Sequence, residues 1–199
     1  MCNEAARRIA LDQLRTDWSE LKIPLRFPEG LPNMAPLESL RITDSSVIIR
    51  PAADTTYEAE LVARRWSWPG PTGKPVYNFR SDGRQLDSGR CLIPVDSFFE
   101  FTAPPADAPK RSPKQKWRFG VAGRAWFCIA GLWRRDPAVS EAWTMLTCPP
   151  GPDIAPYHSR QIVVLPQPAD WAAWLNPSVP SDALCKPLPA GTLTVESVR

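Results

Sequence analysis

The sequence predicts an α+β protein: a single domain over residues 1–199, with a curled, largely antiparallel and barrel-like β-sheet and a few flanking helices. Short apolar segments rich in β-branched and aromatic residues dominate the chain after residue 47, which favours strands. The 24 prolines interrupt the chain too often for a helix bundle. A chain of 199 residues, 43% hydrophobic and 23% charged, is long and apolar enough to bury one core.

Two helices are expected. The first covers residues 4–21, where Asn3 can cap the helix and an apolar stripe follows helical spacing. The residues of this stripe are Leu11, Leu14, Trp18 and Leu21. Prolines and a glycine break residues 25–36, which indicates a loop. A second, shorter helix is expected over residues 170–175, after Pro168.

Strands are expected where apolar and β-branched residues gather between turn formers. These segments are residues 47–49, 60–66, 91–101, 117–121, 125–133, 142–148, 162–165 and 192–198. Gly123 separates two of them, as in a hairpin. The Pro-rich, polar residues 103–113 are expected to form a mobile insertion between two strands.

Charge and cysteine content limit the possible functions. A net charge of +3 does not by itself indicate nucleic-acid binding, so any DNA contact must come from a local patch. The five cysteines are odd in number and include no C-x-x-C pair, which fits neither a disulfide framework nor a zinc site. We therefore expect reduced thiols, no metal and no cofactor. The first residues contain no long apolar run, which predicts neither a signal peptide nor a membrane span.

Cys2 is the first candidate for chemistry. The initiator Met1 is commonly removed when the next residue is small, and its removal would leave a free α-amine beside the thiol. Their ordinary pKa values, roughly 7.7–8.0 for the amine and about 8.5 for the thiol, leave both groups partly deprotonated near neutral pH. Such a 1,2-aminothiol condenses with an aldehyde to a five-membered thiazolidine. The alternative is that Cys2 is an incidental residue at a frayed end.

Two further side chains are suited to proton transfer. His158 is the only histidine in the sequence, and imidazole titrates near neutral pH. Glu100 lies within an aromatic segment, where burial would raise its pKa. The alternatives are a loop histidine that only makes local hydrogen bonds, and a strand edge at which Glu100 points to water.

A third group of residues is suited to holding a ligand. Asn78 and Arg80 would share one face of an extended segment, where an amide can orient a reacting group and a guanidinium can hold a phosphate. A turn is the alternative, because turn-forming residues follow. Trp66 and Trp68 lie beside two arginines, a pattern suited either to stacking on bases or to a core pair with surface arginines. Arg160, close to His158, is open to the same two interpretations.

The order of these residues along the chain resembles that of the SOS response-associated peptidase (SRAP) family, whose members shield abasic sites in single-stranded DNA. The most specific motif, Arg-Cys-Leu-Ile-Pro-x-Asp-x-Phe-x-Glu, matches residues 90–100. The other matching segments are Met1-Cys2, Asn33-Met34-Ala35-Pro36, Arg65-Trp66-Ser67-Trp68, Asn78-Phe79-Arg80-Ser81-Asp82, Ile129-Ala130-Gly131-Leu132-Trp133, Met145-Leu146-Thr147 and His158-Ser159-Arg160. Together they run from residue 2 to about residue 175.

The resemblance implies a role for each candidate. Cys2 would be the nucleophile that forms a thiazolidine crosslink with an abasic site, after autoproteolytic removal of Met1. Asn78 would position the N-terminal residue, Glu100 would assist imine formation and resolution, and His158 would exchange a proton as the sugar ring opens. The residues implied to hold the strand are Arg80, Arg160, Trp66 and Trp68. The implied partner is single-stranded DNA with abasic sites, bound by a cytoplasmic monomer that joins the nucleoid when it is on DNA.

Two alternatives use the same residues, and one departure from the family pattern bears on DNA binding. A hydrolase could use Cys2 as nucleophile, His158 as base and Glu100 in support. A non-catalytic single-strand binding module is the other alternative, although the modest net charge does not favour strong non-specific binding. Family members usually carry Gly-Arg after Met-Cys, whereas this chain has Asn3-Glu4, and Glu4 cannot meet a phosphate as an arginine would.

Overall fold

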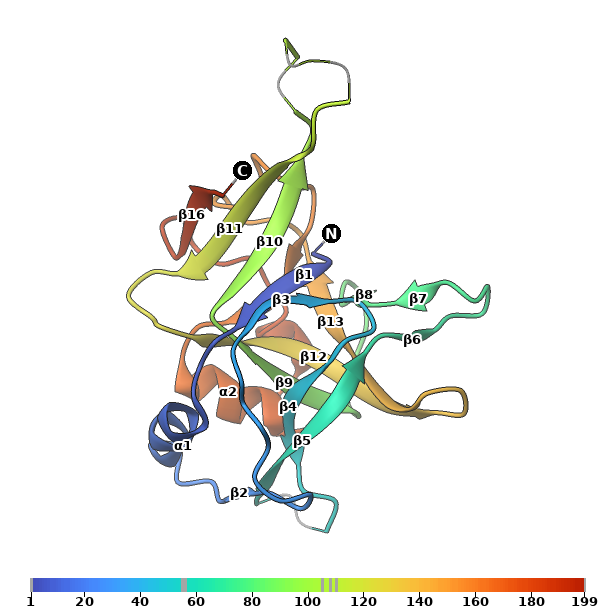
Figure 1. Ribbon diagram of the computed structural model, residues 1–199. Coiled ribbons are helices and arrows are strands. Elements are labelled where there is room, and N and C mark those ends of the chain that lie inside the picture. The colour runs from blue at the N-terminus through green and yellow to red at the C-terminus, as the bar shows by residue number, and fades with distance from the viewer. Residues whose placement is uncertain (1, 55–56, 105, 108, 110, 199) are drawn as a thin grey trace.

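A closed five-stranded barrel forms the centre of the computed structural model, which describes residues 2–54, 57–104, 106–107, 109 and 111–198 (Figure 1). In order around the barrel its strands are β13 (Ser140–Cys148), β12 (Phe127–Asp136), β9 (Arg90–Val95), β4 (Ser45–Pro51) and β5 (Ala59–Trp66). β5 closes the barrel by pairing in parallel with β13, where Trp66 lies opposite Trp143. The other four pairings are antiparallel, which confirms the predicted fold class.

A second sheet of five strands packs against the barrel. Its order is β16 (Leu193–Ser197), β11 (Gln115–Val121), β10 (Ser97–Thr102), β1 (Glu4–Arg7) and β3 (Leu37–Arg41). Only Asp96 separates β9 from β10, so the chain passes from the barrel into the second sheet at that residue. The predicted strand over residues 91–101 is therefore two strands in two sheets.

Short strands and helices complete the fold. The strands are β2 (Leu25–Arg26), β6 (Trp68–Pro69), β7 (Pro75–Val76), β8 (Asn78–Arg80), β14 (Gln161–Ile162) and β15 (Val164–Leu165), and the helices are α1 (Leu11–Ser19), α2 (Pro168–Leu175) and the 3-10 turn η1 (Ser181–Ala183). β8 runs parallel to β13, with Asn78 opposite Met145 and Arg80 opposite Thr147. Among the described residues, none of the helices has the length and apolar character needed to cross a membrane.

Three further sequence-based predictions are wrong in detail. Residues 4–7 form strand β1 and not the start of a helix, because β10 and β3 both pair with this segment; these sheet contacts outweigh a weak local preference for helix. β11 and β12 belong to different sheets, so the turn at Gly123, where φ is +71°, is not a hairpin. The predicted loop over residues 25–36 contains the short strand β2.

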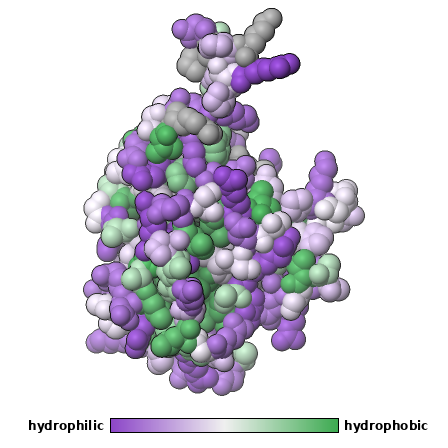
Figure 2. Space-filling view, viewed as in Figure 1, coloured by the Kyte–Doolittle hydropathy of each residue, from purple (hydrophilic) through white to green (hydrophobic). Residues whose placement is uncertain are grey.

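The Pro-rich segment over residues 103–113 lies between β10 and β11 in the chain. Residues 105, 108 and 110 lie outside the described residues, and the mobility of the segment stays a prediction. The described part projects from the ends of the two strands (Figure 1) and is mostly hydrophilic on the face viewed in Figure 2.

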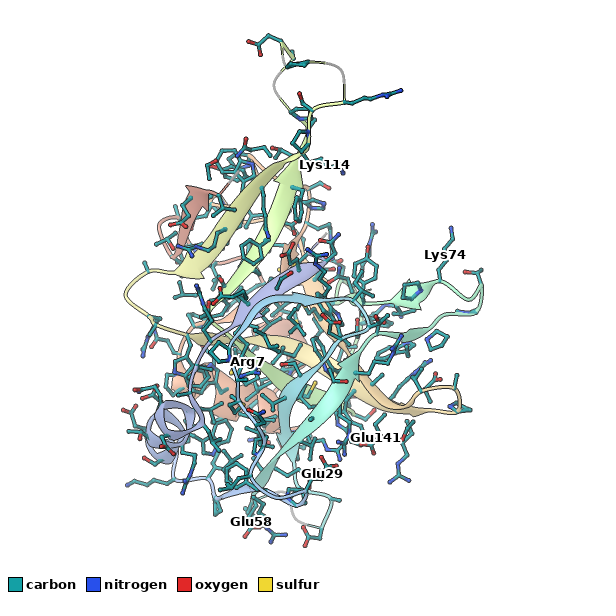
Figure 3. All side chains as sticks on the ribbon, in the orientation of Figure 1. Arg7, Glu29, Glu58, Lys74, Lys114 and Glu141 are labelled. Atoms are coloured by element: carbon teal, nitrogen blue, oxygen red, sulfur yellow. The ribbon has the colours of Figure 1, made fainter. Side chains whose placement is uncertain are left out.

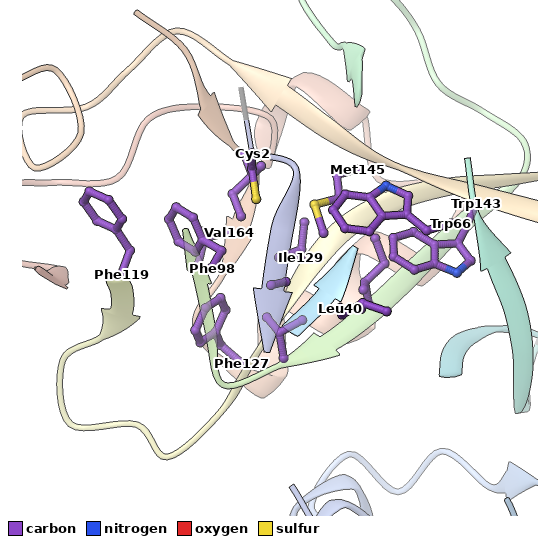
Figure 4. Close-up of a cluster of buried hydrophobic side chains, with 14 of the residues drawn as sticks. Cys2, Leu40, Trp66, Phe98, Phe119, Phe127, Ile129, Trp143, Met145 and Val164 are labelled. Atoms are coloured by element: carbon purple, nitrogen blue, oxygen red, sulfur yellow. The ribbon is translucent and has the colours of Figure 1, made fainter. Parts of the chain in front are cut away.

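The core consists of two clusters on opposite faces of the barrel strands. Alternation along β4 illustrates the division, because Ile48 joins one cluster and Val47 and Ile49 join the other. Figure 4 shows the first cluster, in which Cys2 lies among apolar side chains from the barrel and the second sheet. The second cluster lies under the two helices. Burial of each large apolar side chain stabilises the fold by about 1.5–3 kcal/mol.

Candidate active site

Four of the predicted site residues converge where the second sheet meets the barrel. Cys2 directly precedes β1, Asn78 begins β8, Glu100 lies within β10, and His158 lies in the segment between β13 and β14. The Nδ2 of Asn78 donates a hydrogen bond of 2.7 Å to the carbonyl oxygen of Cys2. Glu100 and His158 line one cleft of about 300 Å³, together with Asn3. The fold thus brings together residues that are up to 156 positions apart in the sequence (158 − 2).

Cys2 is held in place and is not at a frayed end. Its side chain is 1% exposed, and its Sγ donates a hydrogen bond of 3.2 Å to the carbonyl oxygen of Glu4. Burial raises the pKa of the Cys2 thiol well above its usual range, and the nearby charge of Glu100 acts in the same direction. The thiol is therefore protonated at neutral pH in this arrangement, and it is a poor source of thiolate.

Asn78 fixes the backbone of Cys2 through the nitrogen of its side-chain amide. Its Oδ1 is buried, and no hydrogen-bond donor reaches it from the described part of the chain. A buried acceptor without a donor costs about 1–3 kcal/mol. A bound ligand that offers a hydroxyl or an amine would supply the missing donor.

Glu100 is buried, so the alternative in which it points to water is wrong. Glu100 is 3% exposed, and burial raises the pKa of its carboxyl group to about 7. The positive charge of the N-terminal amino group acts in the opposite direction. A carboxyl group with this pKa is present in both protonation states near neutral pH, so it can donate and accept a proton.

His158 has a partner for either protonation state of one ring nitrogen. Its Nδ1 lies 3.0 Å from both the backbone nitrogen and the backbone oxygen of Arg160. An Nδ1 without a proton can accept from that N–H, and an Nδ1 that carries a proton can donate to that carbonyl. Burial lowers the pKa of His158, as does the charge of the N-terminal amino group, so the neutral ring predominates at pH 7.

Trp66 is engaged inside the protein, and the partly buried guanidinium of Arg160 also makes contacts within it. The guanidinium of Arg160 donates to the backbone oxygen of Thr147 at 2.9 Å and forms an ion pair of 2.6 Å with Asp82. Trp66 is fully buried and stacks on Trp143 with ring centroids 5.3 Å apart. The expectation that Trp66 stacks on bases is therefore wrong, because both its position and its ring contact belong to the core.

Trp68 and Arg80 differ in their access to solvent. Trp68 is 6% exposed, and the guanidinium of Arg134 lies 4.4 Å from its ring centroid. It lines a cleft of about 500 Å³ with Phe79, separate from the cleft of Glu100 and His158. Arg80 is exposed, and it lies on the same strand as Asn78.

Lys114, which was not among the residues predicted from the sequence, lines the cleft beside Glu100 and His158. Lys114 is exposed, and it forms no ion pair with any residue that the structure describes. The signal that could have identified it is the basic run at positions 110–118, which lies just before and within the strand that pairs with Glu100. Within the described ranges, no group of three or more His, Cys, Asp or Glu residues could hold a metal ion.

Solved structures share this fold. A protein from Bordetella bronchiseptica is 22% identical, with a TM-score of 0.71 and complete coverage of both chains. A phage-related protein from the same organism is 19% identical, with a TM-score of 0.72 over 100% of this chain and 94% of its own. A protein from Bacteroides thetaiotaomicron is 16% identical, with a TM-score of 0.73 over 100% of this chain and 92% of its own. At these identities the likeness establishes the fold alone.

No match was found among curated proteins. The sequence does match the family described as SOS response associated peptidase (SRAP), and the match covers residues 1–199. The segments that resemble the family include Cys2, Asn78, Glu100 and His158. These four residues lie where the second sheet meets the barrel. The whole-length match shows that this chain belongs to the SRAP family, whose description associates it with peptidases and the SOS response.

Proposed function

We propose that this protein forms a covalent thiazolidine crosslink between Cys2 and the aldehyde of an abasic site in single-stranded DNA, as part of the SOS response to DNA damage. The observation that carries the proposal is the placement of Cys2, which Asn78 holds by its carbonyl at 2.7 Å, beside a buried carboxyl group whose pKa is about 7. In the 199-residue chain the α-nitrogen of Cys2 is part of a peptide bond, so the reaction first requires removal of Met1, which we propose is autoproteolytic.

The proposed chemistry has two steps. The α-amine of Cys2 adds to the aldehyde carbon, and the resulting carbinolamine loses water to form an imine. The thiol then adds across the C=N bond, sulfur to carbon and hydrogen to nitrogen, which closes the five-membered ring. The net reaction releases one water and needs no oxidant or reductant.

Glu100 and His158 are assigned the proton transfers. Loss of water from the carbinolamine needs an acid, whose proton leaves with the water, and closure of the ring needs a base that takes a proton from the thiol. A carboxyl group with a pKa of about 7 suits both tasks. His158, which shares the cleft, would accept or supply a proton as the ring of the sugar opens to the aldehyde.

Asn78 is assigned two tasks, one for each end of its side-chain amide. Its Nδ2 holds the carbonyl of Cys2, which restricts the approach of the aldehyde to one direction. Its buried Oδ1 would accept from a hydroxyl of the opened sugar. The pairing would remove the cost of leaving that oxygen without a donor.

Arg80 and Lys114 replace Arg160 and Trp66 as the residues proposed to hold the phosphate backbone. Both are exposed, and neither forms an ion pair with a described residue. Figure 3 shows Lys114 at the foot of the projecting segment and Lys74 on the β6–β7 hairpin. A strand held by Lys114 and Arg80 would contact the cleft of Glu100 and His158 and the strand that begins at Asn78.

A general cysteine hydrolase is less well supported by the same site. Such an enzyme needs a thiolate, which requires a lowered thiol pKa. Burial and the charge of Glu100 raise the pKa of Cys2 instead. In the proposed route the amine attacks first, so a protonated thiol is no obstacle at that step.

The test combines intact mass with a denaturing gel. Protein shown by mass to begin at Cys2 is mixed with single-stranded DNA that carries one abasic site, next to undamaged DNA and the Cys2→Ser variant. We expect a band that survives denaturation only for wild type with the lesion, at the summed mass of protein and DNA less one water. Absence of that product from protein that begins at Cys2 would overturn the proposal.

A further inference from the structure

We propose that the contact between the rings of Trp117 and Tyr157 positions His158 relative to Glu100, so that Trp117 is a positioning residue of the site. The inference rests on the proposed function, because it assigns His158 and Glu100 to one reaction. Trp117 lies opposite Glu100 on the neighbouring strand. Its ring centroid is 4.8 Å from that of Tyr157, the residue that directly precedes His158.

Trp117 and Glu100 point to the same side of the second sheet. Residues directly opposite each other in an antiparallel pair share a face, and Phe98 and Phe119 form the next such pair along these strands. Tyr157 covers this face, since its ring also lies 5.3 Å from Phe119 in an edge-to-face arrangement. The residue before His158 is therefore docked on the surface that carries Glu100.

The indole of Trp117 is held by two contacts. Its Nε1 donates a hydrogen bond of 2.9 Å to Oγ1 of Thr102, which lies two residues after Glu100 on β10. Its ring then contacts Tyr157 at an interplanar angle of 58°. Because its indole is fixed in this way, Trp117 can hold the segment that carries His158 in a defined position relative to β10.

That segment has little regular structure of its own. The backbone nitrogens of Tyr157 and His158 both donate to the carbonyl oxygen of the buried Ile154, at 2.8 and 3.0 Å, which forms a turn and not a strand. On the far side of His158, Arg160 binds Thr147 and Asp82. His158 thus lies between one anchor on the sheet of Glu100 and one on the barrel.

The two anchors have different effects on the site. Arg160 joins His158 to β13, the strand beside which β8 places Asn78. The Trp117–Tyr157 contact joins His158 to the sheet of Glu100. Removing the indole should leave the barrel and the DNA-facing cations in place while His158 moves relative to Glu100. A displacement of about 1 Å in a reacting group can cost on the order of 100-fold in rate.

The variants are chosen to separate ring contact from general packing. Trp117→Leu removes the ring, and Trp117→Phe keeps a ring without the hydrogen bond to Thr102. Trp126→Leu is the matched control, because Trp126 makes a similar tilted contact of 4.6 Å with Trp171 in the other core cluster. Each variant is first shown to be folded by its thermal unfolding transition.

The first readout is the rate of covalent product formation at saturating DNA, measured beside the affinity for undamaged DNA. For Trp117→Leu we expect a fall in rate on the order of 10- to 100-fold with affinity within about twofold. Trp117→Phe should recover most of the rate, and Trp126→Leu should match wild type. A rate for Trp117→Leu equal to that of Trp126→Leu would overturn the proposal.

The second readout does not depend on crosslinking. His158 is the only histidine, so its ring proton resonance can be followed by NMR as pH is varied. Glu100 from β10, Lys114 beside β11, Arg160 and the N-terminal amine are the charged groups around the ring. Burial lowers the pKa of His158, so loss of the covering contact in Trp117→Leu should raise it, with no change in Trp126→Leu.

The two readouts distinguish failure of the inference from failure of the proposed function. If wild type forms no covalent product, the proposed function fails. The NMR titration of His158 then tests by itself whether Trp117 positions His158. A titration of His158 that is identical in wild type and Trp117→Leu would then overturn the positioning as well. A raised pKa in Trp117→Leu alone would support it.

Discussion

The Nζ of Lys116 lies 2.7 Å from Oε1 of Glu4, and this ion pair spans from β1 across β10 to β11. Ser39 from β3 donates to the same carboxylate oxygen at 2.7 Å. Glu4 is 5% exposed, so the acidic residue that follows Asn3 does not face a DNA phosphate. It ties together the strands around Cys2, whose Sγ donates to the backbone oxygen of Glu4.

Replacing Glu4 by glutamine should therefore destabilise the protein. The change leaves Lys116 without its carboxylate partner in a half-buried position, and we expect a loss of about 1–3 kcal/mol in the free energy of unfolding. Urea denaturation measures it. The matched control is Glu196→Gln, which breaks the exposed pair of Glu196 with Arg118 and should cost under about 1 kcal/mol. Equal losses in the two variants would contradict the assigned role of Glu4.

Replacing Glu100 by glutamine should stabilise the protein at alkaline pH. Burial raises the pKa of Glu100 to about 7 in the folded state, above the value of about 4.3 expected in the unfolded chain. The Glu100 carboxyl group thus holds its proton more tightly in the folded state than in the unfolded chain. Wild type therefore loses stability as pH rises from about 4 through 7. Glutamine cannot ionise, so its advantage should grow to roughly 1–3 kcal/mol by pH 8. A difference in unfolding free energy that does not change between pH 5 and pH 8 would refute this expectation.

Acid should destabilise the protein through a different set of carboxylates. Hydrogen bonds and ion pairs lower the pKa of Glu4, partnered by Lys116 and Ser39, and of Glu141, partnered by Arg64 and Arg50, although burial opposes both shifts. Groups whose pKa is lowered on folding contribute stability above their unfolded pKa and lose it as pH falls through the folded value. We expect the unfolding free energy to fall steadily below about pH 4.3, the ordinary pKa of Glu. Denaturation curves from pH 5 to pH 2 would show this, and the fall should be smaller in Glu4→Gln.

Replacing Asn78 by alanine should slow crosslinking without weakening DNA binding. The variant removes the bond to the carbonyl oxygen of Cys2 and the buried oxygen assigned to the sugar hydroxyl. We expect a fall in rate on the order of 10- to 100-fold at saturating DNA. Single-turnover gels measure the rate, and anisotropy with undamaged DNA measures affinity. A weakened affinity with an unchanged rate would assign Asn78 to DNA binding instead.

Arg80 and Trp66 should show opposite effects, although both were candidates for DNA contact. Arg80→Ala should weaken binding and reduce the slope of log affinity against log salt by about 1, with little change in stability. Trp66→Phe should leave the salt slope unchanged and destabilise the fold, because the ring fills the core and its Nε1 donates to the backbone oxygen of Tyr77. Lys22→Ala, an exposed lysine beyond α1, is the control for a general loss of positive charge. Equal salt slopes for Arg80→Ala and Lys22→Ala would exclude Arg80 from the phosphate contacts.

The sequence alone determined the features that depend on local pattern. Apolar segments placed β4, β5 and β13, and Pro168 with the apolar residues that follow placed α2. The fold class followed from the number and spacing of these segments. The order of motifs also selected Cys2, Asn78, Glu100 and His158 as candidates before their proximity was known, because reactive side chains can be recognised by type and sequence context.

Only the tertiary structure decided the features that depend on distant partners. Glu4–Arg7 is a strand because β10 and β3 lie on either side of it, and Asp96 marks a change of sheet that no apolar run reveals. Trp66 is a core residue because closure of the barrel brings Trp143 against it. Lys116 pairs with a residue 112 positions earlier in the chain. The free energy of such contacts comes from residues far apart in sequence, and a local pattern holds no information about which of them will meet.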